Sequence, residues 1–264
     1  MDALPFDEAR RFGGMQRLYG VEPARRIQSS HVAVIGIGGV GSWVAEALAR
    51  SGVQTITLVD MDHIAESNVN RQIHALTDTL GMAKVEAMRL RIAGINPTCQ
   101  VNCIDAFVEP ENWPHLLPDG VTAVVDACDQ VLSKTAMAAW ARRNKVPFVC
   151  VGAAGGKRLG HLVDVADLSK VTHDPLLAQV RYRLRKFHGA PKDGKTMGVT
   201  CVYSREAVAP PDVSCNLESD GSLNCHGYGS AVTVTATFGM CAAGALMQII
   251  FSSKKETGKI NAII

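Results

Sequence analysis

The chain has 264 residues, of which 47% are hydrophobic and 20% are charged, and its formal net charge is +2. This is the composition of an ordinary soluble globular protein, long enough to bury one large core or two modest ones. It excludes a low-complexity chain, and so small a net charge selects no partner by itself.

The first residues and the cysteines indicate the compartment. Charged side chains at Asp2, Asp7, Glu8 and Arg10 interrupt any apolar stretch before it reaches the length of a secretory signal. The eight cysteines show no paired framework of the kind that disulfide-rich secreted domains carry. Both observations predict a cytoplasmic protein.

Helices and strands alternate along the first half of the chain. Residues 6–28 predict one or two helices, and an apolar, β-branched run at 31–35 is typical of a buried parallel strand. Further elements are expected at 43–50 (helix), 55–59 (strand), 83–93 (helix), 100–104 (strand), 123–125 (strand), 133–144 (helix) and 147–151 (strand). This alternation predicts an α/β fold with a Rossmann-like, mostly parallel sheet.

A glycine-rich turn joins the first strand to the helix that follows. It contains Gly36, Gly38, Gly39 and Gly41. Because glycine has no Cβ, the backbone can turn sharply here, approach a phosphate closely and pack helix on strand. The amides of the helix N-terminus then face the anion. Asp60 lies about 20 residues further on, where a carboxylate can accept hydrogen bonds from a ribose. The sequence therefore predicts an adenine-nucleotide site.

The residues after Asp60 narrow the kind of nucleotide. A carboxylate, two amides and two cations follow: Asp62, Asn68, Arg71, Gln72 and Lys84. A nicotinamide dinucleotide is gripped mainly by backbone amides and needs no such cluster. Cleavage of a triphosphate does need it, because charge that develops on the phosphate oxygens must be met by fixed cations and usually a metal. The cluster favours ATP.

Two further carboxylates follow the fourth strand. Asp126 and Asp129 are expected at the carboxyl edge of the sheet, where open α/β folds bind ligands. Asp126 has two interpretations that the sequence leaves open, since it can face a ligand or cap the turn.

The alternation breaks at Gly152–Gly156. Beyond it the sequence predicts strands at 161–165 and 200–204, a helix at 174–187, and loops at 189–195 and 210–221 that continue or flank the sheet. Positive charge is concentrated from Arg181 to Lys195, which makes this segment a candidate surface for a nucleic-acid backbone. The alternative is an ordinary solvated helix face and loop.

Residues 231–251 form the one long uncharged run. It approaches transmembrane length, but three threonines, Gly239, Gly244, Gln248 and several alanines make it weakly hydrophobic. We expect a buried or interface helix with no integral membrane insertion.

The cysteines argue against a zinc site. No Cys-x-x-Cys pair is present, so a tetrahedral structural zinc site of two such pairs is not expected. Cys225 lies beside His226 and is the best placed thiol for nucleophilic catalysis, but adjacency in sequence is not hydrogen-bond geometry, so its role stays open.

Several stretches carry a family resemblance. The run from Val34 to Lys84 is similar to the adenylating domain of ubiquitin-activating enzymes and of the bacterial molybdopterin-synthase and thiazole-biosynthesis adenylyltransferases. Residues 11–20, 70–76 and 231–239 resemble one branch of that superfamily, the tRNA threonylcarbamoyladenosine dehydratases. The likeness covers nearly the whole chain and is weakest between Arg181 and Asn224.

This resemblance implies one adenylation domain over residues 1–264, with a nucleotide-binding half at about 28–152 and a substrate and dimerisation half at about 153–264. It implies ATP and Mg²⁺ as cofactors and assigns roles to residues. Arg11, Arg71, Lys84 and Asp129 are catalytic, Asp129 also carries the magnesium, and the nucleotide is bound by the glycines of the turn with Asp60, Asn68, Arg71, Gln72, Lys84 and Asp129. Gln130 departs from the asparagine that relatives commonly have after the aspartate, so its role is open.

The resemblance also implies partners. Arg11 is the best positional match to an arginine that reaches the triphosphate of the partner subunit, which requires a homodimer, while a mere surface charge is the alternative. The substrate would be tRNA, and a cysteine desulfurase system is a further partner at which the likeness hints. Whether a monovalent cation binds is left open.

Three functions compete at this point. The first is ATP-dependent cyclisation of threonylcarbamoyladenosine in tRNA through an acyl adenylate. The second is adenylation of the C-terminal carboxylate of a sulfur-carrier or ubiquitin-like protein, which the lack of zinc cysteines and the basic segment disfavour. The third is a nicotinamide-dependent oxidoreductase, which Arg71 and Lys84 disfavour.

Overall fold

A computed structural model describes residues 6–192, 194–210, 212, 214 and 228–252. The helices are α1 (Glu8–Tyr19), α2 (Val21–Gln28), α3 (Gly41–Arg50), α4 (Lys84–Ile95), α5 (Val131–Asn144), α6 (Pro175–Phe187) and α8 (Val232–Ser252). The strands are β1 (His31–Ile35), β2 (Thr55–Val59), β3 (Gln100–Ile104), β4 (Ala123–Asp126), β5 (Phe148–Val151), β6 (Val163–Asp167) and β7 (Thr200–Ser204). Short 3-10 turns occur at Glu66–Asn68, Thr77–Thr79 and Gly160–Leu162.

The strands form one seven-stranded sheet in the order β3-β2-β1-β4-β5-β7-β6. All neighbouring pairs are parallel except β6 and β7. The strand order reverses between β2-β1 and β4, which is the place where ligands bind in such sheets. The prediction of a mostly parallel α/β sheet is confirmed.

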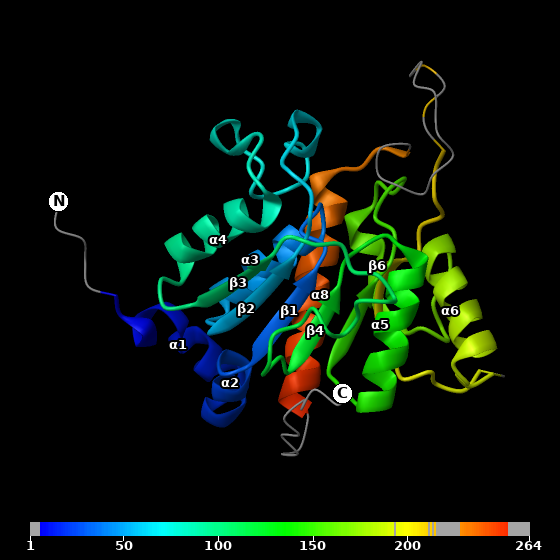
Figure 1. Ribbon diagram of the computed structural model, residues 1–264, viewed down its shortest axis with the longest axis horizontal. Coiled ribbons are helices and arrows are strands. Elements are labelled where there is room, and N and C mark those ends of the chain that lie inside the picture. The colour runs from blue at the N-terminus through cyan, green and yellow to red at the C-terminus, as the bar shows by residue number, and fades with distance from the viewer. Residues whose placement is uncertain (1–5, 193, 211, 213, 215–227, 253–264) are drawn as a thin grey trace.

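Helices cover both faces of this sheet (Figure 1). One core joins the sheet to α2, α3, α4 and α8, and the other joins it to α5 and α6. The strands β1, β2, β4 and β5 are buried on both faces, which explains their continuous apolar runs. In the second core Trp113 and Trp140 meet edge to face, with ring centroids 5.2 Å apart.

The long apolar run forms α8, which crosses the sheet behind β4 and β5 and packs against α3 (Figure 1). It is long and apolar enough to span a membrane, yet half of its most apolar window is buried inside the fold. Gly239 allows the approach to α3, because a Cβ there would lie 2.5 Å from Trp43 Cβ. This packing agrees with the expectation of a buried helix.

Two predicted segments need comment. The strand expected at 161–165 is wrong by two residues, because a 3-10 turn occupies Gly160–Leu162 and the strand begins at Val163. This strand lies at the sheet edge and is only partly buried, so its hydrophobic pattern is weak. The described residues of the predicted loop 189–195 have no helix or strand, whereas most of 210–221, and Cys225, lie outside the described residues.

Candidate active site

The glycine turn lies at the carboxyl end of β1. Gly36 has φ +84° and its N–H donates to the carbonyl of Val59 at 2.8 Å, which ties the turn to the end of β2. A Cβ on Gly41 would clash with the carbonyl oxygen of Gly36. Around Gly38, by contrast, no atom of the described chain lies within 4 Å of the Cβ position. The turn is therefore tightly packed at Gly36 and Gly41 and open at Gly38, where a phosphate would approach.

Asp60 follows β2 and faces this turn. Its carboxylate accepts hydrogen bonds from the N–H of Ile37 at 2.6 Å and from the N–H of Asp62 at 2.8 Å. Burial raises the pKa of Asp60, although the Lys84 charge and these two N–H donors oppose the rise. The side chain is thus fixed in direction beside the turn, as a ribose-binding carboxylate requires.

Lys84 is the first residue of α4, and its side chain points toward Asp60 and Asp62. Its ammonium lies 2.6 Å from Asp62 Oδ2 and 4.0 Å from Asp60 Oδ1, and its side chain is 8% exposed. The two carboxylates at the sheet edge therefore hold this cation in position. The structure thus brings Asp60, Asp62 and Lys84 together beside the glycine turn.

The turn from residue 66 to 72 supplies the second cation. Arg71 donates from Nη1 to Ser67 O at 2.6 Å and to Asn70 Oδ1 at 2.9 Å. Its carbonyl accepts from Trp43 Nε1 at 2.9 Å, which attaches this turn to α3. A Cβ on Gly39 would lie 3.3 Å from Arg71 Cδ, so the arginine lies directly against the glycine turn.

Three buried side chains near this turn have polar atoms that make no hydrogen bond with the residues that the structure describes. They are Arg71 at Nε, Gln72 at Oε1 and His74 at both ring nitrogens. Such groups are rare in folded proteins because each costs free energy, so a cluster of them points to a missing polar partner. A nucleotide phosphate and its hydration shell would supply acceptors and donors at Arg71 and Gln72. Asn68 is also buried, and its Oδ1 accepts from the N–H of Ala65 at 3.1 Å.

His74 is a residue to which sequence reasoning gave no role. Its side chain is 1% exposed. Burial and the neighbouring charges of Lys84 and Arg91 lower its pKa to about 4, so the ring is neutral at neutral pH. In the sequence, the one signal that could have pointed to His74 was its place in the stretch 70–76, which also contains Arg71.

The structure decides between the two interpretations of Asp126. The carboxylate is fully buried and lies 2.9 Å from the ammonium of Lys134, which is fully buried too. Cys128 and Cys150 also donate to it through their thiols, at 3.1 and 3.3 Å. Asp126 therefore holds the chain behind the glycine turn and does not face a ligand. Lys134, its partner, was not singled out from the sequence.

Asp129 lies three residues further on, exposed, just before α5. Its Oδ1 accepts from Gln130 Nε2 at 3.2 Å, and within the described residues no hydrogen bond or ion pair joins it to Asp60, Arg71 or Lys84. No group of three metal-binding side chains occurs in the described part of the chain. A magnesium that takes one carboxylate, with phosphates and water as its other ligands, fits such a donor set.

Arg11 is separated from the rest of the site. Its Nη1 donates to the carbonyl of Ile95, the last residue of α4, at 2.7 Å. Lys84 is the first residue of this 12-residue helix, so the Ile95 carbonyl that Arg11 contacts lies about 17 Å further along the helix axis. Within one protomer the structure does not bring Arg11 to the cations of the site.

Comparisons with known proteins identify this arrangement. Residues 14–263 match the ThiF family, which is nearly the whole chain. The chain belongs to the ThiF family. The tRNA threonylcarbamoyladenosine dehydratase of Escherichia coli is 43% identical, with 94% of this chain and 96% of that protein covered. The enzyme of the same name from Haemophilus influenzae is 42% identical over 93% and 95% of the two chains.

Solved structures agree with this placement in the ThiF family. A crystal structure of the E. coli dehydratase in complex with ATP is 42% identical, covers 94% of this chain and 97% of its own, and superposes with a TM-score of 0.82. A second, in complex with AMP, has a TM-score of 0.83 at 43% identity. The family resemblance drawn from the sequence is confirmed.

Proposed function

We propose that this chain catalyses the ATP-dependent dehydration of N6-threonylcarbamoyladenosine in tRNA. The observation that carries the proposal is the glycine turn flanked by the two cations Arg71 and Lys84, in a chain 43% identical to a dehydratase of that name along nearly its whole length. That substrate has a carboxylate on a side chain that can cyclise. Activating this carboxylate with ATP requires a site that binds phosphates.

The reaction has two steps. An oxygen of the substrate carboxylate attacks the α-phosphorus of ATP, the bond to the β-phosphate oxygen breaks, and pyrophosphate leaves with that electron pair. A nucleophilic atom of the same side chain then attacks the acyl carbon, loses its proton and expels AMP. The carboxylate oxygen leaves with AMP, so the net change is loss of water. Intramolecular attack has a large effective concentration and requires no enzyme thiol.

The residues act on the phosphates in this scheme. Arg71 and Lys84 offset charge that develops in the transition state, and Asn68 and Gln72 orient the phosphate chain. Asp60 binds the ribose and Asp129 carries Mg²⁺, which would polarise a phosphoryl oxygen. Arg11 joins this set from a second subunit. We therefore propose a homodimer, with the nucleotide-binding half at residues 28–152 and the remainder serving substrate and subunit contacts.

A basic surface on α6 suits tRNA. Arg183 and Lys186 lie over the ring of Phe187, at 5.3 and 5.1 Å from its centroid, and Lys186 lies 5.5 Å from the ring of Tyr182. Both rings are more than half exposed. Exposed aromatic rings among cations bind nucleic acids through stacking and charge together. Helix α6 begins near Ala153, which follows β5 and whose N–H donates to the N-cap residue Asp174. From this end the 13-residue helix extends about 20 Å.

The adenylation of a carrier protein is the second candidate function. The 34% identity to an adenylyltransferase and sulfurtransferase from Drosophila sechellia supports it, but over only 43% of this chain. The experiment that separates the two is pyrophosphate release with three additions: tRNA carrying threonylcarbamoyladenosine, unmodified tRNA, and a sulfur-carrier protein. Release with the first alone, together with the cyclic nucleoside by mass spectrometry, supports the proposal. Release with the carrier protein alone overturns it.

The remaining partners are proposals of the same kind. We place the protein in the cytoplasm, where its tRNA substrate is found, and we propose a cysteine desulfurase system as an additional partner. Co-purification of the full chain with such a system tests the second point. The Arg183→Gln, Lys186→Gln double variant tests the basic surface, because losing two phosphate contacts should lower the slope of log affinity against log salt by about 2.

A further inference from the structure

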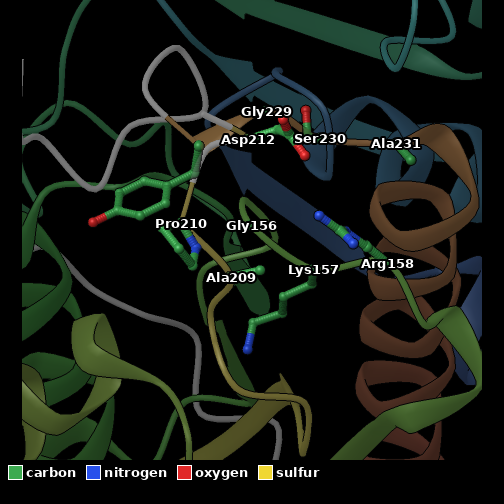
Figure 2. A pocket seen from close by; sticks show the side chains of 10 residues that line it. Gly156, Lys157, Arg158, Ala209, Pro210, Asp212, Gly229, Ser230 and Ala231 are labelled. Carbon is green, nitrogen blue, oxygen red and sulfur yellow. The ribbon is translucent and has the colours of Figure 1, made fainter. Parts of the chain in front are cut away.

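A cleft of about 220 Å³ opens between the segment that follows β5 and the N-terminal end of α8. Figure 2 shows its walls. The residues that line it include Gly156, Arg158, Ala209, Asp212, Tyr228 and Ser230. Its volume is below the roughly 300–1,000 Å³ of pockets that hold drug-sized ligands. It therefore suits one base with a short side chain and not a whole nucleotide.

Arg158 is the exposed cation of this cleft, and its backbone is anchored. The N–H groups of Arg158 and Leu159 donate to the carboxylate of Glu206, at 3.0 and 2.8 Å. The Arg158 guanidinium itself forms no ion pair with a residue that the structure describes, and Figure 2 shows it directed toward the middle of the cleft. Asp212 lines the same cleft, and hydrogen bonds from Ser214 together with the Arg158 charge lower the pKa of its carboxyl, but the two side chains form no ion pair.

Lys157 is adjacent in sequence but serves another purpose. Its ammonium donates to the carbonyl oxygens of Glu206 at 2.7 Å and His173 at 3.2 Å, and the side chain is 2% exposed. In Figure 2 it runs away from Arg158. Lys157 thus fixes the loop through backbone carbonyls, while Arg158 presents its charge to the cleft.

Gly156 holds the two walls together. Its N–H donates to Gly229 O at 2.9 Å, and its carbonyl accepts from Ala209 N at 2.8 Å. It has φ +69°, and a Cβ there would lie 2.7 Å from Val208 and 3.4 Å from the ring of Tyr228. The Tyr228 ring therefore lies beside bare backbone at the wall of the cleft.

The cleft shares a wall with the phosphate-binding turn. Asn70 Nδ2 donates to the carbonyl of Ser230 at 2.9 Å, and Thr235 Oγ1 donates to the carbonyl of Arg71 at 3.4 Å. The hydroxyl of Ser230 is buried and has no hydrogen-bond partner in the described part of the chain. A group bound in the cleft would thus lie beside the residues that hold the phosphates.

We propose that this cleft binds the carboxylate-bearing side chain and base of the modified adenosine, with Arg158 pairing the carboxylate and Tyr228 stacking on the purine. The proposal rests on the proposed function and adds the substrate subsite to it. A guanidinium binds a carboxylate in two parallel hydrogen bonds, which fixes its direction as well as its position. An ionised carboxylate held at the wall shared with Asn70 and Arg71 is oriented for attack on the nucleotide.

The test uses the full chain with Arg158→Met, and Arg25→Met as the matched control. Arg25→Met is the same chemical change at an exposed helix position, where Arg25 pairs with Glu22. Three quantities are measured: affinity for ATP by calorimetry, kcat/KM for cyclisation of modified tRNA, and binding of the free nucleoside N6-threonylcarbamoyladenosine and its carboxamide by NMR. We expect Arg158→Met to keep its ATP affinity and lose about 10- to 100-fold in kcat/KM and in nucleoside affinity.

The carboxamide isolates the ion pair. Wild type should bind the carboxamide about as weakly as Arg158→Met binds either nucleoside, since both changes remove one contact. Tyr228→Leu, a second variant, should weaken the acid and the carboxamide equally. Equal kcat/KM for wild type and Arg158→Met overturns the subsite while leaving the proposed function intact. An inactive wild type with normal ATP binding overturns the proposed function instead.

Discussion

Lys134 Nζ lies 2.9 Å from Asp126 Oδ1, and solvent reaches neither side chain. Burial lowers the pKa of Lys134 and the Asp126 carboxylate raises it, with a net upward shift, so the lysine stays charged. Its ammonium also donates to the carbonyl of Cys128 at 2.9 Å. This pair fixes the Ala127–Cys128 backbone, which would lie 3.0 Å from a Cβ on Gly36. A buried ion pair thus forms the rear support of the nucleotide turn.

Lys134→Met should therefore destabilise the protein by about 3–5 kcal/mol, because it leaves Asp126 buried without its cation. Urea denaturation followed by circular dichroism measures this loss. Lys170→Met, the same change at an exposed position, should stay within about 0.5 kcal/mol. Replacing both partners, as Asp126→Leu with Lys134→Met, should recover much of the loss. A Lys134→Met variant as stable as wild type would contradict this account.

Lys84→Ala should reduce ATP-dependent pyrophosphate release by about 10²–10³-fold, the loss typical of removing one group that stabilises transition-state charge. The fold should remain intact, because Asp62 is 53% exposed and can be solvated, while the buried Asp60 keeps its N–H donors from Ile37 and Asp62. Single-turnover pyrophosphate assays and a thermal melt measure the two effects. Asp62→Asn keeps the cation and removes only its anchor, so it should lose less. Near-normal turnover by Lys84→Ala rejects the role.

Gly38→Ala and Gly41→Ala should fail in different ways. A Cβ on Gly41 meets the Gly36 carbonyl, so this variant should lose stability and ATP affinity together. A Cβ on Gly38 meets nothing in the described chain, so this variant should melt like wild type and yet bind ATP more weakly. Gly94→Ala, inside α4 with free space around it, is the control and should be stabilised by up to about 1 kcal/mol. Wild-type ATP affinity in Gly38→Ala would mean that the phosphate does not lie there.

The grouping of Asp60 with the glycine turn was predictable because both lie at the ends of strands. Asp60 follows β2 directly, and parallel strands bring their carboxyl ends to one edge, so its proximity to the glycine turn and to Lys84 follows from order alone. The cleft at Arg158 was not predictable in this way. Its walls come from three separate segments, residues 156–158, 209–212 and 228–231, joined by contacts of Gly156 and Glu206.

Lys134 and His74 show the other limit. A lysine within a predicted helix is normally solvated, and nothing local marks Lys134 as buried. Its burial depends on Asp126, whose own direction the sequence left open. The partners of a side chain are set by packing between elements, whereas the hydrophobic period reports only the faces of the elements themselves.

The pH dependence of stability should reflect His74. Its pKa is about 4 in the folded protein against about 6.5 when unfolded, so the unfolded state binds the proton first as pH falls. Stability is full above pH 6.5 and is lost down to about pH 4, by about 2 kcal/mol between pH 6.5 and 5. His74→Phe removes this titration, so its urea midpoint should fall less than that of wild type from pH 7 to 5. Parallel curves for the two proteins would contradict the assignment.

Arg11 offers a test of the dimer that is independent of any structure of one. Its hydrogen bond to Ile95 O places it at the opposite end of α4 from Lys84. If Arg11 completes the site of the partner subunit, Arg11→Ala and Lys84→Ala should each be inactive but should complement one another when unfolded, mixed equally and refolded. Half of the dimers are then mixed, and each mixed dimer has one intact site, so about a quarter of wild-type activity should return.

The control for this experiment is each variant refolded alone, which should stay inactive. Action of Arg11 within its own subunit predicts no recovery on mixing, because every site then lacks one of the two cations. A merely superficial Arg11 predicts instead that Arg11→Ala is active by itself. Sedimentation of the mixed sample shows whether dimers form. A dimeric sample without recovered activity contradicts a role of Arg11 in the partner's site, and a monomeric sample contradicts the dimer.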